Sequence, residues 1–195
     1  MMFSEDQLQL FERTGCLVID DFLSVEEVKQ CVDYLKQLED EALLKRANIG
    51  RGSQMQVSDE QRGDYIFWLN NHGQQAVEKL YFDKIEEVRQ ELNRSFFLGI
   101  QEIEAHLAKY PSGGFYKKHS DQHQSGSRRV VSSVLYLNTN WKPEYGGQLV
   151  IDLEEGNTQL IEPQGGRLAL FLSHLLHEVK TTHQDRMSIT GWLLR

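Results

Sequence analysis

Seven histidines stand at positions 72, 106, 119, 123, 174, 177 and 183, and two of them precede an aspartate by two residues. His119-Ser-Asp121 ends a segment that reads as a β-strand. Because residues i and i+2 of a strand point to the same side, this imidazole and this carboxylate would face one space. One further histidine would complete a set of two histidines and one carboxylate, which binds Fe(II) and leaves coordination positions open.

A His-x-Asp pair is a weak signal alone, since seven histidines and 11 aspartates in 195 residues give roughly 0.4 chance matches. The second match, His183-Gln-Asp185, is followed by ten residues without a histidine, so we assign it to a turn. The candidates for the third ligand of the first match are His174, His177 and His183. Of these, His177 opens HEVKTT, which reads as a strand.

Arg186 lies nine residues after His177, at the start of the last predicted strand. An arginine at this place could reach the same cavity across an adjacent antiparallel strand. Its planar guanidinium suits bidentate binding of a carboxylate. A co-substrate with one carboxylate at the metal and a second at this arginine would be 2-oxoglutarate.

Helices are expected in the first third of the chain. Two capping-box patterns, which start at Ser4 and Ser24, precede apolar stripes of helical spacing. The polar segment 48–63 is a candidate lid over the site or a plain connector. The expected elements, in chain order, are a helix that Gly15 ends, a strand at 16–19 and helices over about 25–45 and 82–98.

Short β-rich runs alternate with turn residues after about residue 100, a pattern typical of a sandwich or barrel. We therefore predict a single domain, residues 1–195, with a helical part of about 1–99 and a β core of about 100–195. The N-terminal helices would pack on one sheet of the core. The sequence has no GxGxxG or Walker motif, which argues against a nucleotide-binding α/β fold.

The composition is that of a soluble globular protein, with 39% hydrophobic and 26% charged residues. The net charge of −8 argues against a nucleic-acid partner, because phosphate binding needs a basic face. No run approaches the ~18 apolar residues of a membrane span, and the acidic N-terminus does not resemble a signal peptide. Cys16 and Cys31 lie in apolar surroundings and read as buried thiols of a reducing, cytoplasmic compartment.

Several stretches resemble the Fe(II)- and 2-oxoglutarate-dependent dioxygenases, and within them the prolyl 4-hydroxylase group, which includes the oxygen-sensing prolyl hydroxylases and their bacterial relatives. Together they cover about a third of the chain, in the family's order. The resemblance implies a double-stranded β-helix, or jelly roll. The matching stretches are KYPSGGFYKKHSD at 109–121, RRVVSSVLYLNTNW at 128–141, GGQLVI at 146–151, PQGGRLALF at 163–171, HEVKTTHQDRMSITGW at 177–192 and, before the core, RGDYIFW at 62–68.

The resemblance also implies residue roles. Arg186 matches the residue that binds the distal carboxylate of 2-oxoglutarate. The iron ligands are matched by His119, Asp121 and His177. The rest of the co-substrate pocket is matched by Tyr136, Thr190 and Tyr110. Positions near the peptide substrate of the oxygen-sensing subgroup are matched by Arg129, Tyr116, Trp192, Arg62 and Asp64.

The activity that the resemblance implies is hydroxylation of a prolyl residue in a protein, coupled to decarboxylation of 2-oxoglutarate to succinate and CO2. Fe(II), O2 and ascorbate would take part. The protein substrate would present an extended proline-containing segment, and elongation factor Tu is a candidate by resemblance.

Two alternatives remain at this stage. The first is an oxygenase that acts on a free amino acid, another small molecule or an alkylated base. The second is a non-catalytic metal-binding β-helix protein, in which Zn²⁺ could occupy the same three ligands. Arg186, Tyr136 and Thr190 weigh against the second alternative, because a site that binds only a metal needs no carboxylate clamp.

Overall fold

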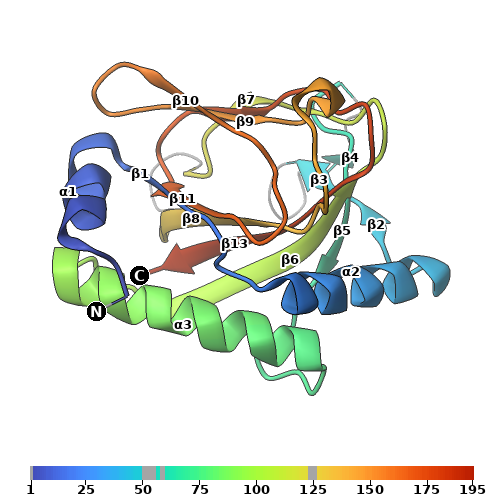
Figure 1. The fold of residues 1–195 in the computed structure, drawn as a ribbon, viewed down its shortest axis with the longest axis horizontal. Coiled ribbons are helices and arrows are strands. Elements are labelled where there is room, and N and C mark those ends of the chain that lie inside the picture. Colours follow the sequence, from blue (N-terminus) through green and yellow to red (C-terminus); the bar gives the residue numbers. More distant parts are fainter. Residues whose placement is uncertain (1, 50–55, 58–59, 123–126) are drawn as a thin grey trace.

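The computed structural model describes residues 2–49, 56–57, 60–122 and 127–195. It has three layers: helices cover one face of a large sheet, and a smaller sheet lies over the other face (Figure 1). Over the described ranges, no helix combines the length and the apolar character that crossing a membrane requires.

The helices are α1 (Glu5–Thr14), α2 (Val25–Asp40) and α3 (Ala76–Phe96). Reciprocal hydrogen bonds form both predicted capping boxes, at Ser4 and Ser24, and Gly15 ends α1 with a φ of 71°. Each box satisfies backbone N–H groups that the first turn of a helix leaves unpaired. The starts of the first two helices were therefore predicted correctly.

The predicted end of the second helix and the predicted start of the third helix were wrong. We expected the second helix to reach about residue 45, but α2 stops at Asp40, and Ala42 adopts a φ of 55°. The next residues pair with another strand of the large sheet. The third helix starts at Ala76 instead of residue 82, because Val77 and Tyr81 extend its buried stripe toward the N-terminus.

Most strands belong to two antiparallel sheets of the described structure. The large sheet has the order β1-β11-β8-β13-β6-β5-β2, and the small sheet has the order β10-β9-β12-β7. β3 and β4 pair only with each other. The strands are β1 (Cys16–Ile19), β2 (Lys45–Arg46), β3 (Asn48–Ile49), β4 (Gln56–Val57), β5 (Tyr65–Trp68), β6 (Glu102–Tyr110), β7 (Tyr116–His119), β8 (Arg129–Tyr136), β9 (Leu149–Asp152), β10 (Thr158–Ile161), β11 (Leu168–Leu172), β12 (His177–Val179) and β13 (Arg186–Leu194).

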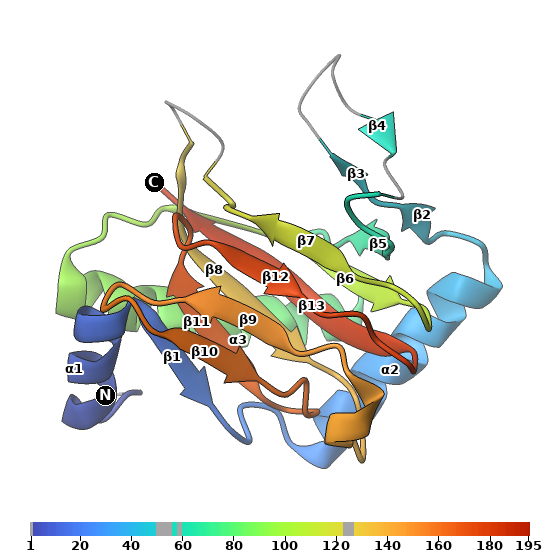
Figure 2. The same ribbon diagram turned by 90° about the horizontal axis from the view of Figure 1, so that it is seen from above.

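This arrangement confirms the predicted fold class, mainly β with flanking helices. β11-β8-β13-β6 of the large sheet face β10-β9-β12-β7, as Figure 2 shows from above. The first 99 residues supply β1, β2 and β5 to the large sheet as well as the helices. β10 was missed, because three of its four residues are exposed and carry no clear apolar alternation. The predicted lid or connector at 48–63 lies partly outside the described residues.

Alternation along β13 separates the two faces of the large sheet. Ile189 and Leu193 belong to the apolar core shared with α2 and α3. Gly191 also points to that side, where an added Cβ would lie 2.2 Å from the Tyr81 hydroxyl of α3. The opposite face of the strand begins with Arg186 and looks toward the small sheet. The helices thus fix the large sheet from outside and leave its inner face for the site.

Candidate active site

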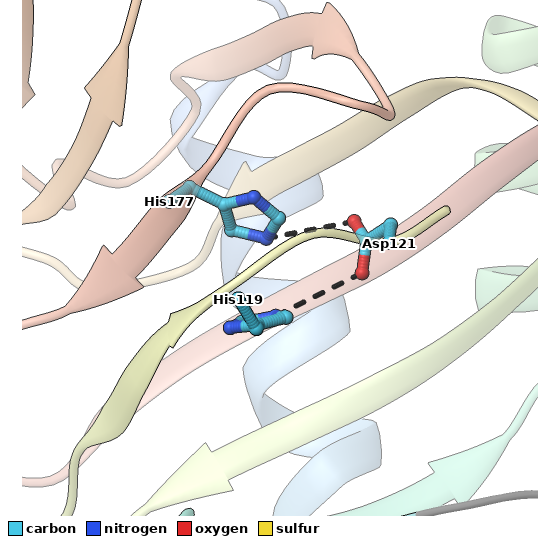
Figure 3. Close-up of side chains that lie close together, drawn as sticks. All are labelled: His119, Asp121 and His177. Atoms are coloured by element: carbon cyan, nitrogen blue, oxygen red, sulfur yellow. Dashed lines mark ion pairs between the residues drawn. The ribbon is translucent and has the colours of Figure 1, made fainter. Parts of the chain in front are cut away.

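His119, Asp121 and His177 come together between the sheets (Figure 3). His119 ends β7, His177 begins β12, and the two are register partners. Asp121 Oδ1 lies 3.8 Å from His119 Nε2, and Asp121 Oδ2 lies 3.5 Å from His177 Nε2. One ligand atom from each residue lies within 4.8 Å of the other two. Two imidazoles and a carboxylate in this arrangement suit a divalent transition metal.

A bulge in β7 directs His119 into the site. Tyr116 pairs with Val179 and His119 pairs with His177, so three steps of β7 match two steps of β12. The extra residue turns Tyr116 and His119 to the same side of the strand. Inside the bulge, the Lys117 carbonyl lies 2.8 Å from His119 Nδ1.

The same kind of contact orients the second imidazole. The Leu175 carbonyl lies 3.0 Å from His177 Nδ1. In both histidines Nδ1–H therefore donates to a backbone carbonyl, and Nε2 keeps its lone pair for a metal. The local backbone thus selects the tautomer that a ligand needs.

Hydrogen bonds fix Asp121 beyond the end of β7, where strand alternation no longer applies. Its backbone N–H and that of Gln122 both donate to the Ser173 carbonyl, at 3.1 Å. The Ser132 hydroxyl donates to Asp121 Oδ2 at 2.7 Å and lies 2.9 Å from the Ser173 hydroxyl. These contacts hold the carboxylate between the two imidazoles.

The charge states of His119 and Asp121 match metal binding at neutral pH. Burial and the neighbouring His177 lower the pKa of His119 to about 4. Burial alone would raise the pKa of the Asp121 carboxyl, but His177, His119 and the Ser132 hydroxyl together lower it. A neutral imidazole and an ionised carboxylate are the forms that bind a metal.

Arg186 is a buried cation at the start of β13, on the face of the large sheet that looks toward the small sheet. Its residue is 1% exposed, and its guanidinium lies 5.1 Å from the ring centres of both Tyr110 and Tyr136. Its Nε donates to the Gly147 carbonyl at 2.9 Å, and it forms no ion pair within the described part of the chain. A buried charge without a counter-ion is unfavourable, so this pocket suits an anionic ligand.

Two buried hydroxyls beside Arg186 point to the same ligand class. Tyr136 on β8 and Ser188 on β13 are register partners. Among the described residues, neither hydroxyl has a hydrogen-bond partner. Burial raises the pKa of Tyr136 to about 12, so its hydroxyl stays protonated and can donate. A carboxylate bound to Arg186 would accept from both hydroxyls and remove this cost.

The structure also brings Tyr110 and Thr190 to this face, as the sequence predicted. Tyr110 at the end of β6 is the register partner of Arg186, and Thr190 follows Arg186 by four residues on β13. Because a strand alternates with a period of two, Arg186, Ser188 and Thr190 share one face. The residues predicted to bind the co-substrate therefore lie on one face of the large sheet, and Ser188 lies among them.

Aromatic side chains form a wall at the other end of this face. The rings of Trp68, His106 and Trp192 all contact one another. The centroid of His106 lies 5.1 Å from that of Trp68 and 5.4 Å from that of Trp192, and the two indole rings are 6.0 Å apart. Arg129 stacks on Trp192 at 3.6 Å from the ring centre and pairs with Glu104 at 2.6 Å. Trp68 is 51% exposed at the rim of this wall. The wall presents an apolar surface with a cationic edge.

Arg62, Asp64 and Tyr116 lie together beside His119. Arg62 donates to both carboxylate oxygens of Asp64, at 2.6 and 2.5 Å. The Arg62 guanidinium also lies 4.3 Å from the Tyr116 ring centre. The Asp64 side chain is fully buried, so its contacts are within the protein.

The other described histidines and Cys31 take no part in these contacts, whereas Cys16 belongs to the apolar cluster that holds Tyr110 and Tyr136. His174 Nε2 lies 2.6 Å from Glu154 Oε1 on the surface, and His123 is outside the described residues. His183-Gln-Asp185 occupies the predicted bend before β13. Cys16 and Cys31 are buried thiols, as expected.

Sequence analysis missed four polar or aromatic contributors to the site: Ser132, Ser188, His106 and Trp68. Their signal was present in the period-two alternation of the strands. Ser132 shares a strand face with Tyr136, Ser188 lies between Arg186 and Thr190, and His106 shares a face with Tyr110. The contacts of Ser173 with residues 120–122 had no comparable signal, because they join segments that are distant in sequence.

A family model described as the 2OG-Fe(II) oxygenase superfamily matches residues 105–194, which hold the triad and Arg186. A solved structure, a prolyl-4-hydroxylase of Pseudomonas putida, is 33% identical and covers 97% of each chain with a TM-score of 0.88. The chain belongs to the 2OG-Fe(II) oxygenase superfamily. Within that superfamily, its similarity is to prolyl hydroxylases.

Other relatives of this oxygenase agree with that placement. Egl nine homolog 1 of Homo sapiens is 30% identical over 189 residues, which are 91% of this chain and 43% of the relative. The chain thus spans about half the length of such curated relatives. Prolyl hydroxylase EGLN3 of Homo sapiens is 29% identical over 91% of this chain and 77% of the relative. A prolyl hydroxylase from Trichoplax adhaerens, solved in complex with a hypoxia inducible factor oxygen degradation domain peptide fragment, is 26% identical, with a TM-score of 0.85, over 96% of this chain and 87% of that one.

Proposed function

We propose that this oxygenase hydroxylates a prolyl residue in a protein substrate and couples the reaction to oxidation of 2-oxoglutarate to succinate and CO2. One observation carries the proposal. Among the described residues, Arg186 has no counter-ion and two buried hydroxyls have no hydrogen-bond partner on the inner face of the large sheet, and the two-histidine, one-carboxylate set lies between that face and the small sheet. Family membership implies the same Fe(II), 2-oxoglutarate and O2 chemistry.

The metal ligands in this proposal are His119 Nε2, His177 Nε2 and one carboxylate oxygen of Asp121. Their donor set fits Fe(II), because imidazole and carboxylate are its usual ligands in oxygenases of this kind. Two neutral imidazoles and one carboxylate would leave a divalent ion with one net positive charge. That charge favours an anionic chelating co-substrate.

Arg186, Tyr136 and Ser188 would bind the distal carboxylate of 2-oxoglutarate, with Thr190 and Tyr110 as further walls of the pocket. The guanidinium offers a planar pair of donors, and each hydroxyl offers one more. These contacts orient the co-substrate and exclude water from its charged end. When bound, Fe(II) supplies the oxidative chemistry, in which O2 is consumed by the co-substrate and by a substrate C–H bond.

The aromatic wall is the proposed place for the substrate. Trp192 and Arg129 would meet the segment that carries the proline, and the half-exposed Trp68 extends that surface outward. The family resemblance assigns Tyr116, Arg62 and Asp64 to positions near the peptide substrate, and we include them in the proposed substrate site. An aromatic wall with Arg129 at its edge suits an extended peptide whose proline is inserted toward the metal.

The proposal also includes a protein partner, a cellular location and an auxiliary reductant. The Trichoplax relative was solved with a peptide fragment, which supports a peptide as the substrate class. Elongation factor Tu is proposed as the protein partner on the family resemblance alone. Cytoplasmic location and ascorbate as an auxiliary reductant are proposed on the same ground.

The experiment is turnover of metal-free protein reconstituted with Fe(II), 2-oxoglutarate and O2. Candidate proteins, with elongation factor Tu first, are assayed by peptide mass spectrometry for one added oxygen on a proline, and succinate is measured in parallel. We expect equal amounts of succinate and hydroxyproline, and neither product from His177→Ala. Succinate formation that free amino acids stimulate and proteins do not would contradict the protein substrate.

A further inference from the structure

Tyr116 makes a contact with His119 that a position near the substrate does not explain. Its ring stacks on the ring of His119, with a centroid distance of 3.6 Å and an angle of 19° between the planes. Residues three apart on a regular strand point to opposite sides. They can stack here because the β7 bulge inserts one extra residue between them. The backbone irregularity thus brings an aromatic plane against a proposed metal ligand.

The opposite face of the Tyr116 ring is covered as well. The guanidinium of Arg62 lies 4.3 Å from the ring centre, and Asp64 holds that guanidinium through two hydrogen bonds. Carboxylate, guanidinium, phenol ring and imidazole therefore follow one another in a continuous stack. The Arg62 and Asp64 side chains are nearly or fully buried, so the arrangement is little screened by water.

Backbone contacts keep the stack in register. The segment 61–63 runs antiparallel to β7, with Arg62 opposite Tyr116 in an isolated bridge. Gly63 N–H donates to the Phe115 carbonyl, and Lys117 N–H donates to the Gln61 carbonyl, both at 2.9 Å. Lys117 is also the bulge residue whose carbonyl accepts from His119 Nδ1. One short segment therefore supports both the plane and the tautomer of His119.

We propose that Tyr116 and Arg62 are positioning residues for His119, which hold its imidazole plane in the orientation that metal binding requires. The inference rests on the metal site of the proposed function and is independent of the substrate. Without the stack, the His119 ring would be free to take other orientations, and metal binding would have to order it. Loss of such supporting contacts typically costs about 10–100-fold in metal affinity.

Tyr65 provides a matched control on the other side of the large sheet. Arg46 lies 5.0 Å from the Tyr65 ring centre, so the pair repeats the arginine-over-tyrosine geometry. On β5, Ile66 packs against the inner apolar cluster and Phe67 against the outer one. By alternation, Tyr65 therefore points away from the triad. Removal of its ring tests for general effects of losing such a stack.

The test is an anaerobic titration of metal-free protein with Co²⁺ alone. Binding is measured by calorimetry and by the absorption spectrum of bound Co²⁺. Tyr116→Leu should weaken Co²⁺ binding by about 10–100-fold, while Tyr116→Phe and Tyr65→Leu stay within about threefold of the wild type. In proton NMR of the Co²⁺ form, the His119 ring N–H signal should move in Tyr116→Leu and the His177 signal should stay. The melting temperature of the metal-free variants reports folding separately.

A second variant covers the case in which Tyr116→Leu does not fold. The double substitution Arg62→Leu with Asp64→Leu removes both charges together and leaves the Tyr116 ring in place. It should weaken Co²⁺ binding by at least about threefold. Unchanged affinity in the folded variants, or an equal loss in Tyr65→Leu, would overturn the positioning role. An error in the proposed metal site would give a different result. The wild type would bind no Co²⁺, or His177→Ala would bind it as tightly as the wild type. Either result also overturns the inference.

Discussion

Tyr136 and Ser188 are direct register partners on β8 and β13, and in the described structure both carry a buried hydroxyl without a hydrogen-bond partner. Beside them lies Arg186, whose charge is equally buried and unpaired. A guanidinium without a counter-ion and two hydroxyls without an acceptor, as the described residues leave them, make this place suited to a carboxylate. Their arrangement explains how a β-sandwich with an apolar core can hold a small dicarboxylate.

The two hydroxyls are expected to contribute separately to co-substrate binding. Ser188→Ala and Tyr136→Phe should each raise the dissociation constant of 2-oxoglutarate by about 10–150-fold, because a hydrogen bond to a charged group contributes ~1.5–3 kcal/mol. The measurement is calorimetric titration of the Co²⁺ form with 2-oxoglutarate. Co²⁺ affinity is the internal control and should not change. Wild-type affinity for 2-oxoglutarate in both variants would show that the carboxylate binds elsewhere.

Arg186→Leu should weaken the binding of 2-oxoglutarate without destabilising the metal-free protein. The requirement for 2-oxoglutarate should rise by at least about 100-fold, since truncating one partner of a buried charge pair costs roughly 3–5 kcal/mol. The metal-free protein should unfold at an equal or higher denaturant concentration, because the substitution removes an unpaired buried cation. Urea unfolding and 2-oxoglutarate titration check the two halves. A variant that is less stable without co-substrate would mean that another group already compensates this charge.

Ser132→Ala tests the support of the carboxylate ligand. Without the 2.7 Å hydrogen bond to Asp121 Oδ2, the carboxylate is free to rotate, and metal affinity should fall by about tenfold. Affinity for 2-oxoglutarate at saturating metal should change little. Ser132→Thr keeps the hydroxyl and should retain most of the affinity. Equal losses in Ser132→Ala and Ser132→Thr would indicate a packing effect instead.

His106 predicts a defined pH dependence of folding. Burial lowers the pKa of this histidine to about 4 from an ordinary value near 6.5. Between these values the unfolded chain binds a proton that the folded chain does not, so stability falls as the pH drops from 6.5 to 4. The loss attributable to His106 approaches about 3 kcal/mol at the low end.

The check is urea unfolding of metal-free wild type and His106→Leu at several pH values. His106→Leu should lose less stability than the wild type between pH 6.5 and 4. His119 titrates in the same range in both proteins and therefore cancels in the comparison. Parallel profiles for the two proteins would contradict the neutral, buried state of His106.

Much of this architecture could be predicted from local patterns. Capping boxes at Ser4 and Ser24 fixed two helix starts, and alternation along the last strand placed Arg186 and Thr190 on one face. The β half was legible because turn residues separate its short apolar runs. Where the apolar pattern is weak, as in β10, the strand is defined by its partner instead, and it was missed.

Other features depend on contacts between distant segments. The stack of Tyr116 on His119 contradicts simple alternation and follows from the register shift against β12. Asp121 was expected to face His119 as a strand neighbour, but it lies beyond β7 and is placed by Ser132 and Ser173. Neither relationship can be deduced from the spacing of residues along the chain.

We expect His119, Asp121 and His177 to bind an Fe(II) ion to which 2-oxoglutarate coordinates. The most direct measurement is the visible absorption spectrum of metal-free protein to which Fe(II) and then 2-oxoglutarate are added without oxygen. A weak charge-transfer band should appear only when both are present, and it should be absent from His177→Ala. A wild-type protein that binds iron by metal analysis but shows no such band with 2-oxoglutarate would contradict the account.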